Sequence, residues 1–137
     1  MKIAVFQFLK GRETGEEIFL RSLKNVKYQK VNLGKKFYFQ MDDNEKEKTR
    51  AEAVKAFKEI AEAVENGIYD MVVADEIICC GEMGIIEKNE IERLIKRKHC
   101  NTELILTGRG AWKTVIELAD TVTEMRKIKH PYDKDIS

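Results

Sequence analysis

The chain has 137 residues, of which 43% are hydrophobic and 36% are charged, and its net charge is +1. This length predicts a single domain, residues 1–137, with a core that needs no disulfide or metal to hold it. The small net charge argues against general attraction to nucleic acid or to an anionic membrane. No apolar stretch is long enough to span a membrane and the start lacks signal-peptide features, so we expect a cytoplasmic protein.

The first part of the chain alternates short apolar runs with an amphipathic segment. Residues 3–8 (IAVFQF) are apolar enough to predict a buried strand, and residues 26–31 predict a short strand. Between them, residues 15–22 predict a short helix, because Glu16 and Glu17 carry negative charge suited to a helix amino end.

The clearest helix follows Asp42 and Asp43, which are favourable amino-terminal caps. Asn66-Gly67 predicts its end, since glycine readily adopts the left-handed conformation that closes a helix. Apolar residues recur at steps of three and four along this segment, which predicts one buried face. The expected stripe consists of Ala51, Val54, Phe57, Ile60 or Ala61, and Val64.

Two more strands and two more helices are expected in the second half. Residues 71–74 and 104–106 read as buried strands, and residues 88–98 and 112–119 as helices. Residues 121–128 alternate polar and apolar side chains, which predicts a strand near the edge of the sheet. The alternation of strands and helices predicts a three-layer α/β fold, with a mostly parallel sheet and helices on both faces.

The strand at residues 71–74 ends in two adjacent acids, Asp75 and Glu76. Ligands of open α/β sheets bind outside the carboxyl ends of the strands, so these acids are candidate catalytic residues. Carboxylate oxygens also suit Mg²⁺, so the same pair is a candidate metal site that would hold a phosphate-bound ion. The alternative is a strand that simply ends in solvated acids.

A second candidate is the loop Thr107-Gly108-Arg109-Gly110, which joins a strand to a helix. Backbone amides of Gly108 and Gly110 and the guanidinium of Arg109 would suit a phosphate or a carboxylate. The alternative is a tight turn that needs glycine in any case, with Arg109 in solvent.

Three consecutive aromatics, Phe37, Tyr38 and Phe39, form the last candidate. They suit either a lid or stacking platform for a ligand, or a core or dimer contact. The sequence holds no Gly-x-x-x-x-Gly-Lys-Ser/Thr phosphate loop.

Several stretches share their order and spacing with one family. They are Gln7–Gly11 followed by Gly15-Glu16, Val72–Ile77, Leu106–Ala111, Ile116–Arg126 and Lys129–Asp133. On the strength of these stretches the chain resembles, over residues 5–133, the P-loop type of ATP:corrinoid adenosyltransferases. That family makes adenosylcobalamin and its precursors, from substrates such as cob(I)alamin and cob(I)yrinic acid a,c-diamide.

The resemblance implies ATP, Mg²⁺ and a corrinoid substrate, whose Co(I) attacks the 5′ carbon of ATP while triphosphate leaves. It implies that Glu76, with Asp75 beside it, is the acid on the magnesium side, and that Arg109 contacts the nucleotide site. Phe37 and Phe39 match an aromatic pair beside the corrinoid, with phenylalanine where the family has tryptophan.

Because family members carry a strand and a P-loop before the stretch that matches Ile3, we expect a P-loop-derived fold without its first strand. The function would be that of a truncated or degenerate adenosyltransferase, or of one whose P-loop comes from a partner, and the chain would form a homodimer. The alternative is a non-catalytic module that binds a corrinoid or another small ligand without ATP.

Overall fold

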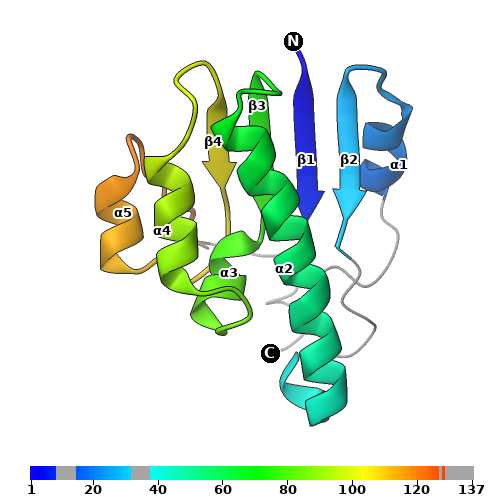
Figure 1. Ribbon diagram of the computed structural model, residues 1–137, viewed down its shortest axis with the longest axis vertical. Helices are drawn as coiled ribbons and strands as arrows, with labels where there is room; N and C mark the ends of the chain where they lie inside the picture. The colour runs from blue at the N-terminus through cyan, green and yellow to red at the C-terminus, as the bar shows by residue number, and fades with distance from the viewer. Residues whose placement is uncertain (9–14, 32–37, 127, 129–137) are drawn as a thin grey trace.

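The computed structural model describes residues 1–8, 15–31, 38–126 and 128 (Figure 1). Four parallel strands form one sheet in the order β2-β1-β3-β4. The elements in chain order are β1 (Ile3–Gln7), α1 (Gly15–Ser22), β2 (Val26–Lys30), the 3-10 turn η1 (Tyr38–Gln40), α2 (Asp43–Glu65), β3 (Met71–Asp75), α3 (Ile77–Glu82), α4 (Lys88–Lys96), β4 (Glu103–Leu106) and α5 (Lys113–Leu118). The α/β class and the parallel sheet predicted from the sequence are confirmed.

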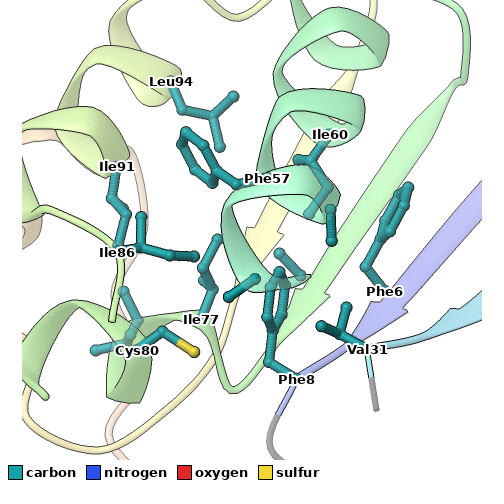
Figure 2. Close-up of a cluster of buried hydrophobic side chains, with 14 of the residues drawn as sticks. Phe6, Phe8, Val31, Phe57, Ile60, Ile77, Cys80, Ile86, Ile91 and Leu94 are labelled. Carbon is teal, nitrogen blue, oxygen red and sulfur yellow. The ribbon is translucent and has the colours of Figure 1, made fainter. Parts of the chain in front are cut away.

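The core lies on one face of the sheet, under α2, α3 and α4 (Figures 1 and 2). Side chains alternate along a strand, so Ala4, Phe6 and Phe8 share this face. Figure 2 shows side chains of the helices packed over Phe6 and Phe8. The labelled members are Phe6, Phe8, Val31, Phe57, Ile60, Ile77, Cys80, Ile86, Ile91 and Leu94.

Helix α1 covers part of the other face. Tyr28 pairs with Val5, which alternates with the core residues of β1, so its ring points away from the core. The guanidinium of Arg21 in α1 lies 4.8 Å from the centre of that ring. Helices therefore lie on both faces of the sheet, as the sequence predicted.

Helix α2 begins with a capping box at Asp42. The Glu45 N–H donates to Asp42 Oδ1 at 2.8 Å, and the Asp42 N–H donates to Glu45 Oε1 at 3.4 Å. The helix ends before Gly67, whose φ of +64° is left-handed, so both predicted ends are confirmed.

The buried stripe of α2 differs from the expected one. Phe57, Ile60 and Val64 are buried as predicted, whereas Ala51 and Val54 are exposed. The observed stripe includes several small residues and consists of Thr49, Ala53, Ala56, Phe57, Ile60, Ala63 and Val64.

The strand predicted at residues 121–128 is wrong. Residues 121–126 have no regular secondary structure, and Val122 and Met125 are exposed. Alternation produces a strand only where a neighbouring strand and a covering layer bury one face, and this segment has neither within the described part of the chain. Among the described residues, no helix has the length and apolar character needed to cross a membrane.

Candidate active site

The carboxyl ends of β1 and β3 lie at the same level of the sheet. Gln7 is the last residue of β1 and pairs with Asp75, the last residue of β3. Thr107 follows β4 directly, and its N–H donates to the Ala74 carbonyl oxygen at 3.3 Å. The edge where open α/β sheets bind ligands therefore carries an amide, a carboxylate and a hydroxyl side by side.

Asp75 is held from two sides. The hydroxyl of Thr107 donates to Oδ1 at 2.7 Å, and Nε2 of Gln7 donates to Oδ2 at 3.2 Å. These bonds orient the carboxylate and offset the cost of partly burying it.

Gln7 was not predicted as a site residue, because within an apolar run it reads as one more strand position. Its side chain is 5% exposed, and its amide makes bonds in three directions. Nε2 donates to Asp75 Oδ2 and to Glu16 Oε1, the latter at 3.4 Å, and Oε1 accepts from the Tyr28 hydroxyl. The signal available in the sequence was a lone polar side chain just before the end of a buried strand.

Glu76 has an unusual backbone conformation. Its φ of +67° makes it the only non-glycine residue with positive φ among those the structure describes. For an L residue this costs about 1–2 kcal/mol. Its N–H donates to the Thr107 hydroxyl at 2.9 Å and its Oε2 accepts from the Cys79 thiol at 3.1 Å. Such strain persists where the surroundings demand a particular turn, here the one that starts α3.

Cys79 joins the acid pair to the loop after β4. Its sulfur lies 3.1 Å from Glu76 Oε2 and accepts from the Arg109 N–H at 3.2 Å. Burial, and then the hydrogen bond to the Glu76 carboxylate, raise the pKa of the Cys79 thiol. The thiol is therefore protonated at neutral pH and acts as a hydrogen-bond donor. Burial also raises the pKa of Cys80 to about 12, so this core thiol is not a nucleophile.

The loop Thr107–Gly110 packs tightly on α3. Gly108 has a φ of +140°, and a Cβ there would lie 2.9 Å from the backbone nitrogen of Cys79. Gly110 has a φ of +82°, and a Cβ there would lie 2.9 Å from Glu82 Cγ. The turn therefore requires glycine at Gly108, as the structural alternative predicted, whereas a ligand contact of these glycines stays a prediction.

Arg109 is exposed beside this turn. Within the described part of the chain its guanidinium makes no hydrogen bond or ion pair with another side chain. Its main chain, by contrast, is fixed by Cys79. The main chain of Arg109 is therefore linked to Glu76 through Cys79, and its exposed side chain carries a positive charge on a loop whose position is set.

The predicted aromatic site is only partly described. Phe37 lies outside the described residues, as does the segment Lys129–Asp133. Phe39 lies in η1, where its side chain is 73% exposed, so it is not a core residue. Tyr38 beside it packs partly against the core.

Comparison with known proteins places the chain in one family. A family model described as ATP:corrinoid adenosyltransferase BtuR/CobO/CobP matches residues 1–137. A corrinoid adenosyltransferase from Pseudomonas aeruginosa is 35% identical over 99% of this chain and 66% of its own length. One from a Sinorhizobium species is 35% identical over 99% of the chain and 64% of its own length, and one from Escherichia coli is 27% identical over 98% and 67%. This chain thus spans about two-thirds of the length of these relatives, and it belongs to the ATP:corrinoid adenosyltransferase family BtuR/CobO/CobP.

Proposed function

We propose that this chain acts in corrinoid adenosylation, the transfer of the 5′-deoxyadenosyl group of ATP to the Co(I) of a corrinoid. Family membership supports the reaction class. The observation that carries the proposal is the convergence of Asp75, Glu76 and the Arg109 loop at the carboxyl edge of a parallel sheet, joined through Thr107 and Cys79.

The chemistry of this reaction demands charge stabilisation at one place. The electron pair of Co(I) forms the bond to the 5′ carbon of ATP, the bond from that carbon to oxygen breaks, and triphosphate leaves with its electron pair. Negative charge therefore grows on the leaving group. The exposed guanidinium of Arg109, on the loop that Cys79 links to Glu76, would contact the leaving phosphates.

The donor set at this edge fits magnesium rather than a softer metal. Asp75 and Glu76 supply carboxylate oxygens, and Mg²⁺ is commonly held by one or two carboxylates together with substrate phosphates. Among the described residues no group of three or more His, Cys, Asp or Glu side chains would hold a metal alone, which agrees with a site completed by phosphates. Bound magnesium would offset the negative charge of the triphosphate.

We propose further that the cradle for the triphosphate comes from polypeptide outside this sequence, either in the same protein or in a different partner chain. The 137 residues contain no Gly-x-x-x-x-Gly-Lys-Ser/Thr loop, whose backbone amides and lysine usually neutralise phosphates. Derivation of the fold from the P-loop class is part of the same proposal. The exposed ring of Phe39 is the proposed corrinoid contact among the described residues.

The decisive experiment mixes this chain, together with the polypeptide that carries the phosphate cradle, with cob(I)alamin, ATP and magnesium and follows adenosylcobalamin by absorbance. Asp75→Asn should lower kcat/KM by about 100-fold, since it removes a charge at the reacting end of the sheet. Asp70→Asn is the matched control, because Asp70 lies at the opposite end of the same strand and accepts from the Lys2 N–H.

The control should stay within about threefold of the unaltered chain, as surface substitutions away from a site usually do. Equal rates for the two variants would remove Asp75 from the mechanism. Corrinoid binding without ATP binding or turnover would instead show a non-catalytic binding module.

A further inference from the structure

Side chains at the carboxyl edge form a continuous hydrogen-bonded row across all four strands. Tyr28 of β2 donates to Gln7 of β1, Gln7 donates to Asp75 of β3, and Thr107 after β4 donates to Asp75 from the other side. Each strand or its following residue thus contributes one member, and Gln7 and Asp75 are each bonded by neighbours on both sides.

The amide of Gln7 has one chemically sensible orientation. Its nitrogen faces two carboxylates, Asp75 and Glu16, and its oxygen faces the Tyr28 hydroxyl. The reversed amide would set an oxygen against both carboxylates, so it would lose two donors and gain repulsion. Gln7 is therefore a fixed donor, and Asp75 Oδ2 cannot rotate away without losing it.

The hydroxyl of Thr107 is likewise fixed in direction by its hydrogen bonds. A hydroxyl has one hydrogen and two lone pairs. Its hydrogen points to Asp75 Oδ1, and a lone pair accepts the N–H of Glu76 at 2.9 Å. One side chain therefore sets the direction of the Asp75 carboxylate and also holds the backbone of Glu76 in its left-handed turn.

We propose that Thr107 and Gln7 are positioning residues that fix the Asp75 carboxylate in the direction needed to hold a magnesium–triphosphate group. This inference rests on the proposed function above. Partners that orient a ligating carboxylate typically change metal affinity or activity by 10- to 100-fold when removed. Neither residue touches substrate in this scheme, and both act through Asp75.

A matched control is present on the same strand. Thr102 precedes β4 as Thr107 follows it, and its hydroxyl donates to the Tyr69 carbonyl oxygen at 2.8 Å. Thr102→Val and Thr107→Val are therefore the same substitution at opposite ends of β4. Thr102→Val removes one hydrogen bond, to Tyr69 before β3, and Thr107→Val removes two, to Asp75 at the end of β3 and from Glu76 after it. Both should lower Tm.

The experiment measures Mn²⁺ binding in the presence of ATP by electron paramagnetic resonance, because Mn²⁺ takes the same oxygen ligands as Mg²⁺. It uses this chain together with the polypeptide that carries the phosphate cradle. Thr107→Val should raise the Kd for Mn²⁺ by about 10- to 100-fold, and Thr107→Ser should restore it to within about threefold. Gln7→Met, which keeps the length of the side chain without its donor, should raise it by about 10-fold. Thr102→Val should leave the Kd unchanged.

Equal Mn²⁺ affinities in Thr102→Val and Thr107→Val would overturn the proposal, and so would an unaltered chain that takes up no Mn²⁺ with ATP. Turnover is measured in parallel to separate the two hypotheses. An unaltered chain that makes no adenosylcobalamin but loses Mn²⁺ affinity with Thr107→Val contradicts the proposed function and supports the positioning role. An active chain with equal Mn²⁺ affinities in both valine variants supports the proposed function and contradicts the positioning role.

Discussion

The two ends of the sheet use their polar side chains differently. At the amino end, the hydroxyl of Thr102 donates to a main-chain oxygen, that of Tyr69. At the carboxyl end, the hydroxyl of Thr107 donates to the side chain of Asp75, which also accepts from Gln7. Bonds between side chains are only about 10–15% of the hydrogen bonds in proteins. The carboxyl end therefore uses its hydrogen bonds to orient side chains, whereas the amino end uses them to hold the main chain.

The largest expected effect comes from comparing two glycines, Gly108 in the loop after β4 and Gly84 between α3 and α4. Gly108→Ala should destabilise the protein by about 3 kcal/mol, because a Cβ would meet the backbone of Cys79 in addition to the strain of positive φ. Gly84→Ala should cost about 1 kcal/mol, since Gly84 has a φ of +75° and nothing lies within 4 Å of its added Cβ. Urea unfolding measures both, and equal losses would show that the close approach of loop and helix is unimportant.

The next largest effect should be a difference in stability between variants that lose a tyrosine hydroxyl at either end of the sheet. Tyr28→Phe removes the donor to the buried Gln7 amide and should cost about 1–2 kcal/mol. Tyr69→Phe at the amino end should cost less than about 0.5 kcal/mol, because within the described residues the Tyr69 hydroxyl has no hydrogen bond. Thermal unfolding of the two variants compares them, and a larger loss for Tyr69→Phe would contradict this reading.

The backbone of Glu76 tests whether the carboxyl end is strained. Glu76→Gly should be more stable than Glu76→Ala by about 1 kcal/mol, because only glycine relieves the left-handed conformation. Glu76→Ala itself should fold with nearly unchanged Tm, as expected of an acid at a strand end. A large loss of Tm in Glu76→Ala would show that the acid has a structural role.

The smallest expected effect is a pH dependence from Glu17. Burial acts to raise the pKa of Glu17, but the hydrogen bonds and charges of Arg21 and Lys30 outweigh it and lower that pKa below 4.5. A carboxyl whose pKa is lower in the folded state stabilises the protein above the unfolded pKa. That contribution disappears as the pH falls through the folded pKa. The Tm difference between the unaltered chain and Glu17→Gln should therefore shrink on acidification, and an unchanged difference would contradict it.

Local patterns were sufficient to predict most of the elements. The apolar runs at residues 3–8 and 71–74 could only be buried strands, and the structure confirms both. Helix α3 was not expected, because the glycines at 81 and 84 argue against a long element. It forms as a six-residue helix because Glu76 adopts the left-handed turn that lets Ile77 and Cys80 reach the core.

The candidate site was predictable only in part. Asp75, Glu76 and Arg109 belong to motifs that carry their chemistry in their residue types. Gln7 and Thr107 acquire their roles from strand register, and that pairing joins residues 68 and 32 positions apart. No local pattern in a single sequence contains this information.

The pairing of β1 with β3 has a consequence for synthesis of the protein. Gln7 and Asp75 are separated by 68 positions, although they are register partners. Ribosomes add about 5–20 residues per second, so β1 waits roughly 3–14 s for its central neighbour. During that time its edge toward β3 has no strand to pair with, and contacts of such long range form slowly. Until β3 emerges, the nascent chain carries an exposed β1 edge suited to a chaperone, and the candidate site does not yet exist.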